Sequence, residues 1–363
     1  MTTRGSWTDH AGVIHLHSIH SFDGRRTVQE ILAAANNSGI DFLMLTDHAS
    51  LQARAEGLEG WQGRTLLVVG EEISPRFNHY LAFGLSDPIS TSPGQEEMSP
   101  QTCIDRIADG GGIGFIAHPD HGGTERFHVK HYPWTDWSVT GYTGLGIWDF
   151  MTDWQRGLTG YGRALIGYAF PSSLLRGPSP VTLTRWDRLT RERRVVGIGE
   201  LDNHDTLYRI LGFKLPVFPF RRVFRLIRTH VLTEAPFTGD SPADIASLLQ
   251  ALRSGHAYVS LDSKHDARGF RFTLTEGTQT ATMGDEFSLS DFAELAVSFP
   301  ANARIRIIRN GTLLHQRQGT TLSEVIREPG TYRIEADLMF FGRYRPWIFS
   351  NPIYVSRSLK RPS

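Results

Sequence analysis

Short apolar runs alternate with amphipathic stretches over roughly the first 260 residues of the chain. The run Ile40–Leu45 (IDFLML) has the length of a buried strand. It is preceded by a stretch whose apolar positions fall on one helical face: Val28, Ile31, Leu32 and Ala35. Thr27 and Glu30 have capping-box spacing, and Gly39 is a typical helix terminator. The pattern therefore predicts a capped helix followed by a buried strand.

The same alternation recurs along this part of the chain. Further strands are expected at Gly12–Ser18, Leu66–Val69, Tyr80–Phe83, Ile113–Ala117, Val195–Ile198 and Ala257–Ser260. Helices are expected near Pro100–Ala108 and at Ser241–Arg253, where Pro242 takes the first helical position. Strands that alternate with helices predict a parallel sheet with both faces covered. We favour a closed βα barrel, with an open doubly wound sheet as the alternative.

The pattern changes from about Asp262, where helical spacing gives way to strands without intervening helices. The expected strands are Phe270–Leu274, Leu295–Phe299, Ala303–Arg309, Tyr332–Ala336 and Pro352–Val355. Asn310-Gly311 lies between two of these runs and is a strong hairpin signal. We therefore predict two domains, an α/β barrel at 1–261 and a small antiparallel β-sandwich at 262–363.

Composition narrows the possible functions. The chain has 363 residues, of which 40% are hydrophobic and 21% charged, as is usual for a globular protein. Lys+Arg and Asp+Glu both number 38, so no overall charge attracts nucleic acid. The single cysteine, Cys103, excludes a thiolate-rich metal site and fits a reducing cytoplasm. We see neither a secretory signal nor an apolar run long enough for a transmembrane helix, and expect a cytoplasmic protein that can form a homo-oligomer.

Histidine is the unusual residue, with 15 copies. His15 and His17 are two positions apart on one predicted strand, so their imidazoles should project from the same face. Two imidazoles so placed can share one divalent metal ion. The alternative for an isolated pair is two partly buried histidines satisfied by hydrogen bonds.

This pair is not isolated, because other metal-binding residue types lie near the ends of predicted strands. These residues are Asp23, His48, Glu72, His79, His118, Asp202 and His204. Each has a structural alternative, such as a turn residue before Gly24 for Asp23 or a surface histidine for His48. In a βα barrel, however, strand ends meet at one face, where carboxylates and imidazoles can surround divalent cations.

At this point the chain resembles the PHP superfamily, named for polymerase and histidinol phosphatase. The segments that carry the resemblance are HLHSIHSFDG at 15–24, TDH at 46–48, GEEIS at 70–74, HYLAFG at 79–84, AHP at 117–119 and LDNH at 201–204. The resemblance implies a distorted seven-stranded βα barrel that binds up to three metals. MGDEF at 283–287 and RPWIFSNPIYV at 345–355 are similar to the β-domain of the branch related to carbamate hydrolases.

Carried over by position, the resemblance implies three metal sites. One is formed by His15, His17, Glu72 and Asp202; the second by Glu72, His79 and His118; the third by Asp23, His48 and His204. Glu72 is preferred over Glu71 because the family pattern places its carboxylate directly before an Ile or Val. Two or three Zn²⁺, Mn²⁺ or Fe²⁺ ions are expected cofactors. The catalytic residues would be His15, His17, Glu72, His118 and Asp202, around a hydroxide that bridges two metals.

Three functions follow, in order of preference. The first is hydrolysis of a phosphomonoester or phosphodiester in a small molecule. The second is hydrolysis of a carbamate or carboxylic ester. The third is a non-catalytic, metal-stabilised interaction module.

Several residues outside the ligand set are expected near the site. Asp47 and Glu200 are expected to orient ligand imidazoles, and His121, Arg126 and His128 to contact substrate. Four tryptophans have two interpretations, an apolar pocket or core packing: Trp134, Trp137, Trp148 and Trp154. An arginine-rich segment, 221–228, follows the apolar stretch 211–220 and predicts a lid, an amphipathic patch or an ordinary charged helix.

Overall fold

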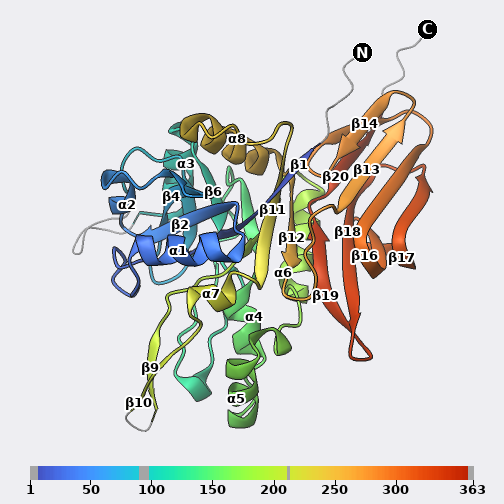
Figure 1. Ribbon diagram of the computed structural model, residues 1–363. Helices are drawn as coiled ribbons and strands as arrows, with labels where there is room; N and C mark the ends of the chain where they lie inside the picture. Colours follow the sequence, from blue (N-terminus) through green and yellow to red (C-terminus); the bar gives the residue numbers. More distant parts are fainter. Residues whose placement is uncertain (1–6, 90–97, 211–212, 359–363) are drawn as a thin grey trace.

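The computed structural model describes residues 7–89, 98–210 and 213–358. Figure 1 shows a mixed α/β part, coloured blue to yellow, beside an all-β part in orange and red. The two parts share one hydrogen-bonded network of strands, because β12 (Ala257–Leu261) of the first pairs with β19 (Arg343–Ser350) of the second. The chain is therefore a mixed α/β protein with a large sheet.

Seven strands pair in succession in the α/β part. They are β1 (Thr8–Ile14), β2 (Phe42–His48), β4 (Thr65–Ile73), β5 (Tyr80–Phe83), β6 (Ile113–Ile116), β7 (Gly144–Asp149) and β8 (Val196–Glu200). The end of β8 returns to the end of β1, since Leu201 N donates to Ile14 O over 3.0 Å and Leu16 bridges to Asn203 in parallel. The strand order thus begins and ends at β1.

The expectation of a purely parallel sheet is wrong at β5, which runs antiparallel to both β4 and β6. The reason is the short connection between β4 and β5, residues 74–79, because a parallel crossover needs about a dozen residues or more. The strand β11 (Ile227–Thr233) also pairs antiparallel, with β1 on one side and β12 on the other. Arg228 and His230 interrupt its apolar pattern, so the sequence did not predict this strand.

The helices begin and end close to the sequence signals where these were strong. The helices are α1 (Val28–Ser38), α2 (Gln52–Ala55), α3 (Pro100–Asp109), α4 (Phe150–Arg156), α5 (Tyr161–Ala169), α6 (Pro180–Thr190), α7 (Phe220–Val223) and α8 (Ser241–Ser254), with 3₁₀ turns η1 (Glu125–Phe127) and η2 (Pro171–Ser173). The capping box of α1 is confirmed, since Thr27 and Glu30 each accept from the other's backbone N–H. Gly39 ends this helix with a φ of 67°, in the left-handed region.

Alternate residues of the strands enter two apolar clusters. Leu43 and Leu45 of β2 join a cluster with the apolar face of α1, whereas Phe42 and Met44 join a second cluster. The second cluster gathers side chains from six of the seven strands, and Leu248 of α8 joins it. The strands are therefore buried on both faces, which fixes their register and holds their carboxyl ends in place.

The all-β part contains eight strands. They are β13 (Arg271–Glu276), β14 (Gln279–Thr282), β15 (Glu286–Leu289), β16 (Ala293–Arg309), β17 (Thr312–Ile326), β18 (Gly330–Phe340), β19 and β20 (Ile353–Arg357). Their pairing is antiparallel except between β15 and β20. The two runs expected at 295–299 and 303–309 form one long strand, β16. Asn310 and Gly311 make the predicted hairpin, with φ values of 51° and 82° that suit a type I′ turn.

Three short strands lie outside these sets. β3 (Gly60–Gln62) pairs with β4, and β9 (Leu207–Ile210) pairs with β10 (Phe213–Pro216) in a hairpin of their own. The apolar stretch 211–220, which precedes the arginine-rich segment, falls in part on this hairpin, and Leu211 and Gly212 lie outside the described residues.

Candidate metal centre

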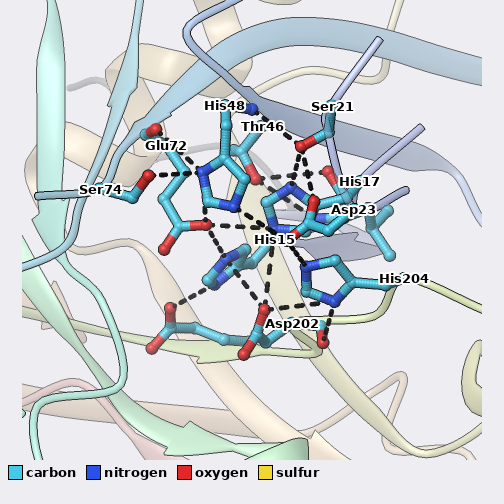
Figure 2. Close-up of polar contacts among 12 residues, drawn as sticks. His15, His17, Ser21, Asp23, Thr46, His48, Glu72, Ser74, Asp202 and His204 are labelled. Carbon is cyan, nitrogen blue, oxygen red and sulfur yellow. Dashed lines mark hydrogen bonds and ion pairs between the residues drawn. The ribbon is translucent and has the colours of Figure 1, made fainter. Parts of the chain in front are cut away.

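Nine side chains from the sequence prediction converge at the carboxyl ends of the strands. Figure 2 labels His15, His17, Asp23, His48, Glu72, Asp202 and His204 among them. His15 and His17 follow β1, His48 ends β2, Glu72 lies near the end of β4, and His118 follows β6. The remaining members come from loops beside these strands: Asp23, His79, Asp202 and His204. Because consecutive strands pair side by side, residues far apart in the sequence meet at one edge.

Glu72 lies between two sets of imidazoles. Its Oε2 is 3.0 Å from His15 Nε2 and 3.1 Å from His17 Nε2. Its Oε1 is 2.8 Å from His79 Nδ1 and 3.4 Å from His118 Nε2. The neighbouring Glu71 points to the other face of β4, where it accepts from the backbone N–H of Ile89. Glu72 can therefore serve two adjacent groups, one with each oxygen.

Asp202 completes the group on the Oε2 side. Its Oδ1 lies 3.4 Å from His15 Nε2 and 3.7 Å from His17 Nε2. Ligand-type atoms of His15, His17, Glu72 and Asp202 all lie within 4.8 Å of one another, as do those of Glu72, His79 and His118.

A third group surrounds Asp23, in the loop after β1. Its Oδ2 is 3.2 Å from His204 Nε2 and 3.4 Å from His48 Nε2. His17 belongs to this group too, because its ring stacks on that of His204 with centroids 4.1 Å apart. His17 thus links the third group to the first, as Glu72 links the first to the second.

The donor sets fit divalent cations. His17 Nε2 is buried and has no hydrogen-bond partner among the described residues, although it lies within reach of two carboxylates. Buried polar atoms without a partner are rare, and histidine–carboxylate sets without sulfur suit Zn²⁺, Mn²⁺ or Fe²⁺. The His17 ring is fully buried between Glu72 and Asp202, and these are the surroundings that a bound cation requires.

The backbone is strained at three of these residues. His15, His118 and Asp202 have φ values of 73°, 26° and 48°, in the left-handed region that residues with a side chain rarely adopt. Such conformations cost about 1–3 kcal/mol each and persist where the surrounding structure enforces them, often at functional sites. The fold thus forces these three side chains into the cluster.

Charges in the cluster balance one another. Burial opposes ionisation of Glu72, but His15, His48 and His79 outweigh it and hold the pKa of Glu72 well below its usual range. Burial likewise disfavours the charged imidazole of His118, yet the hydrogen bond to Glu72 and the field of Asp202 raise the pKa of His118 to about 9. A cation entering the cluster therefore displaces protons from imidazoles, so binding should strengthen as pH rises.

Glu200 orients two members of the cluster. It is fully buried; its Oε2 lies 3.0 Å from His15 Nδ1 and its Oε1 accepts from the backbone N–H of His118 over 2.9 Å. Asp47 differs from the expectation, because it accepts from Ser18 N and Ser18 Oγ and contacts the turn after His17 instead of a ligand imidazole.

The three residues expected to contact substrate differ in their burial and in their distance from the metal centre. His121 is buried, with its ring 5.4 Å from that of His118. Burial and the neighbouring His118 lower the pKa of His121 to about 4, so this ring is neutral near pH 7. Arg126 and His128 are exposed on the loop around η1, and no described contact joins them to the three groups.

The four tryptophans contribute to the apolar core. Trp134 and Trp148 are buried in the main apolar cluster, against which Trp137 and Trp154 pack, so core packing is the interpretation that holds.

In the arginine-rich segment, the buried Arg228 contacts Asp262. Arg222 donates to the backbone oxygens of Tyr168 and Ala169, whereas Arg221 and Arg225 are exposed.

Two residues at the site, Asp149 and Phe22, were not predicted from the sequence. Asp149 ends β7, and burial together with Asp202 and Glu200 raises its pKa to about 7. A carboxylate directly after an apolar run was the available signal, but the glycines of GLGIWD weakened the strand pattern. Phe22 is the second residue that was not predicted; 85% of its surface is exposed, and its ring stacks on that of His48 with centroids 4.8 Å apart.

A fourth group of possible ligands lies away from this centre. It comprises His230, Asp262 and Asp266. Both ring nitrogens of His230 already face carboxylates, Nδ1 at 2.8 Å from Asp9 and Nε2 at 3.3 Å from Asp262. Arg228 also contacts Asp262, so this group is explained as a buried ion network.

Comparisons with known proteins assign no family. No family model and no curated protein matches the chain. Among solved structures it is similar to an amidohydrolase from Chromobacterium violaceum that was determined with bound sulfate and no metal. The sequence identity is 17% and the TM-score 0.32, over 57% of this chain and 92% of that one. At this level the likeness assigns neither a family nor an activity.

In the described part of the chain, none of the helices combines the length and apolar character needed to cross a bilayer.

Proposed function

We propose that this chain is a metal-dependent hydrolase of ester bonds, with phosphomonoesters or phosphodiesters as its substrates. The observation that carries the proposal is the position of Glu72, whose two oxygens face different sets of imidazoles. A carboxylate so placed can hold two cations side by side, as in many enzymes that hydrolyse phosphate esters.

Two or three Zn²⁺, Mn²⁺ or Fe²⁺ ions would be held by the three groups described above, which include all nine predicted ligands. When bound, these ions supply Lewis acidity and lower the pKa of water at the site. In support of the PHP-type architecture, seven strands pair in order and β8 returns to β1; we assign residues 1–261 to a distorted barrel and 262–363 to a β-sandwich with its own apolar cluster.

The chain's own residues supply orientation and a hydrogen bond to the substrate. Glu200 holds the His15 ring with Nε2 toward Glu72. Nδ1 of His121 accepts from Tyr132 N, so the neutral ring carries its proton on Nε2. His121 can therefore donate a hydrogen bond to a substrate oxygen beside His118, the role proposed for it.

A carbamate or carboxylic ester is the second candidate substrate. Phe22 supports it, because its exposed ring lies against His48 at the edge of the candidate metal centre and could contact an aromatic or acyl group. A phosphate group has no comparable need for an apolar contact.

The test begins with metal analysis of the purified protein, followed by assays on p-nitrophenyl phosphate, its bis-ester and an aryl N-methylcarbamate. We expect at least one transition metal per chain and metal-dependent turnover. His17→Ala and Asp202→Ala should abolish both, whereas the matched controls in the all-β part, the half-buried His315→Ala and the exposed Asp291→Ala, should retain both.

The outcomes separate the alternatives. Turnover of the carbamate alone would replace the phosphoester by the second candidate. A metal-loaded protein that turns over neither class would leave a metal-stabilised interaction module. A protein that binds no divalent cation would remove the proposal altogether.

A further inference from the structure

A small pocket lies beside the candidate metal centre, between the ends of β6 and β7 and the starts of α4 and α6. Its lining includes His118, Asp149, Thr152, Asp153, Ser179 and Thr182. It has room for about one water molecule. His118 is the member that also belongs to the candidate metal centre.

Four side-chain atoms of the residues around this pocket are buried without a hydrogen-bond partner in the described structure. They are His118 Nδ1, Asp149 Oδ1, Thr152 Oγ1 and Asp153 Oδ1. All four residues are more than nine-tenths buried. Leaving such an atom unpaired is costly, so several of them around one small space indicate a bound polar molecule.

We propose that Asp149 is a positioning residue for His118 and acts through a water molecule held in this pocket. The inference rests on the proposed function, in which His118 binds a cation. His118 turns Nε2 toward Glu72, at 3.4 Å, so Nε2 is the nitrogen that would bind a cation; with the cation bound, Nε2 must be free of its proton and Nδ1 must carry one. The Nδ1–H then needs an acceptor, and histidines that bind metals regularly find one in a carboxylate or a water.

Asp149 is held in the orientation that this role requires. Its Oδ2 accepts from the backbone N–H of Thr152 over 2.6 Å and so caps α4. The other oxygen, Oδ1, is left for the pocket. Because one oxygen is committed to the helix, the carboxylate cannot turn away from the pocket without losing the cap.

Asp153 provides a matched comparison on the same helix. It lines the same pocket, and its Oδ2 accepts from Trp148 Nε1 and from the backbone N–H groups of Arg176 and Gly177. Asp153 thus has three donors, all outside the metal centre, whereas Asp149 has one, the backbone N–H of Thr152. Asp149 also ends β7, which pairs with β6, the strand that His118 follows, so Asp149 is the carboxylate assigned to His118.

The test compares Asp149→Asn with Asp153→Asn in the full chain. In Asp149→Asn the amide oxygen can still cap α4, which turns the NH₂ group toward the pocket. That donor favours the other His118 tautomer, with the proton on Nε2. We expect Zn²⁺ affinity, measured by competition with a chelating dye, to fall by about 10–100-fold. Asp153→Asn should stay within about threefold. Nitrogen NMR of labelled histidine in the Zn²⁺-loaded protein should show a shifted His118 Nδ1–H signal in Asp149→Asn only.

Each outcome bears on the proposal. Unchanged Zn²⁺ affinity or an unchanged His118 Nδ1–H signal in a folded Asp149→Asn would overturn it, while hydrolysis by the wild type would leave the proposed function intact. Weaker Zn²⁺ binding in a protein that hydrolyses nothing would support the positioning role and reject the hydrolase. If the wild type binds no Zn²⁺, both fall. Should Asp149→Asn fail to fold, Asp149→Ser keeps a capping hydroxyl and gives the same Zn²⁺ comparison.

Discussion

Nδ1 of His15 lies 3.0 Å from Oε2 of Glu200, although the two residues are 185 positions apart in the chain. This contact fixes the His15 ring so that Nε2 faces Glu72, also at 3.0 Å. The other oxygen of Glu200 accepts from the backbone of His118. One buried carboxylate thus orients two candidate ligands that belong to different groups.

Glu200→Gln should weaken cation binding by about 10–100-fold. His15 Nδ1–H and His118 N–H both require an acceptor, and an amide offers only one oxygen. Metal content after dialysis against a chelator and the Kd for Zn²⁺ would measure the effect. Glu286→Gln, an exposed partner of Arg194, is the control and should change neither. Equal Zn²⁺ affinity in both variants would show that Glu200 has no orienting role.

Gly146→Ala should disturb Glu200 without changing any polar group. A Cβ at Gly146 would lie 1.3 Å from Glu200 Oε1, and that side chain is fully buried and held by two hydrogen bonds. We expect a loss of about 1–3 kcal/mol in the free energy of unfolding, measured with urea, together with weaker Zn²⁺ binding. Gly162→Ala in α5, where a Cβ meets nothing within 4 Å, should be neutral or slightly stabilising. A fully stable Gly146→Ala variant with wild-type Zn²⁺ affinity would contradict this packing argument.

His230 should make the free energy of unfolding depend on pH. Burial opposes the charged ring, but Asp262 and Asp9 outweigh it and raise the pKa of His230 to about 9. Its charged ring therefore stabilises the fold fully below the unfolded-state pKa of about 6.5, and this contribution is lost as pH rises through about 9. His230→Gln should cost about 3–5 kcal/mol at pH 6 and clearly less at pH 10. Urea unfolding of both proteins at the two pH values measures this difference, and a cost that does not change with pH would reject it.

Arg333→Met should destabilise the contact between α6 and β18. Arg333 is buried and makes two hydrogen bonds to Asp187, of 2.6 and 2.9 Å, and one to Glu335 of 2.6 Å. Its removal leaves buried carboxylates without their cation, which costs about 3–5 kcal/mol. The exposed pair of Arg327 and Asp291 supplies the control, Arg327→Met, for which about 0–1 kcal/mol is expected. Adding Asp187→Asn to Arg333→Met should recover part of the loss, and chemical unfolding of all the variants tests the series.

Local structure could be predicted where neighbouring residues determine it. The capping box of Thr27 and Glu30 needs only residues three apart, and Asn310-Gly311 sets its own turn through two positive φ values. The boundaries of α3, α8 and β5 follow from the same short-range signals. The sequence also indicated which residue types could bind a metal, because imidazoles and carboxylates followed apolar strands.

Tertiary structure alone decided how those residues meet. The place of Glu200 behind His15 and the pocket between Asp149 and His118 depend on which strands pair and at what distance. Asp47 shows the same limit, since it follows a strand as expected but contacts Ser18. Local signals arise from steric and hydrogen-bonding preferences of adjacent residues, whereas these contacts join residues 29 to 185 positions apart, whose distance is set by packing of the whole chain.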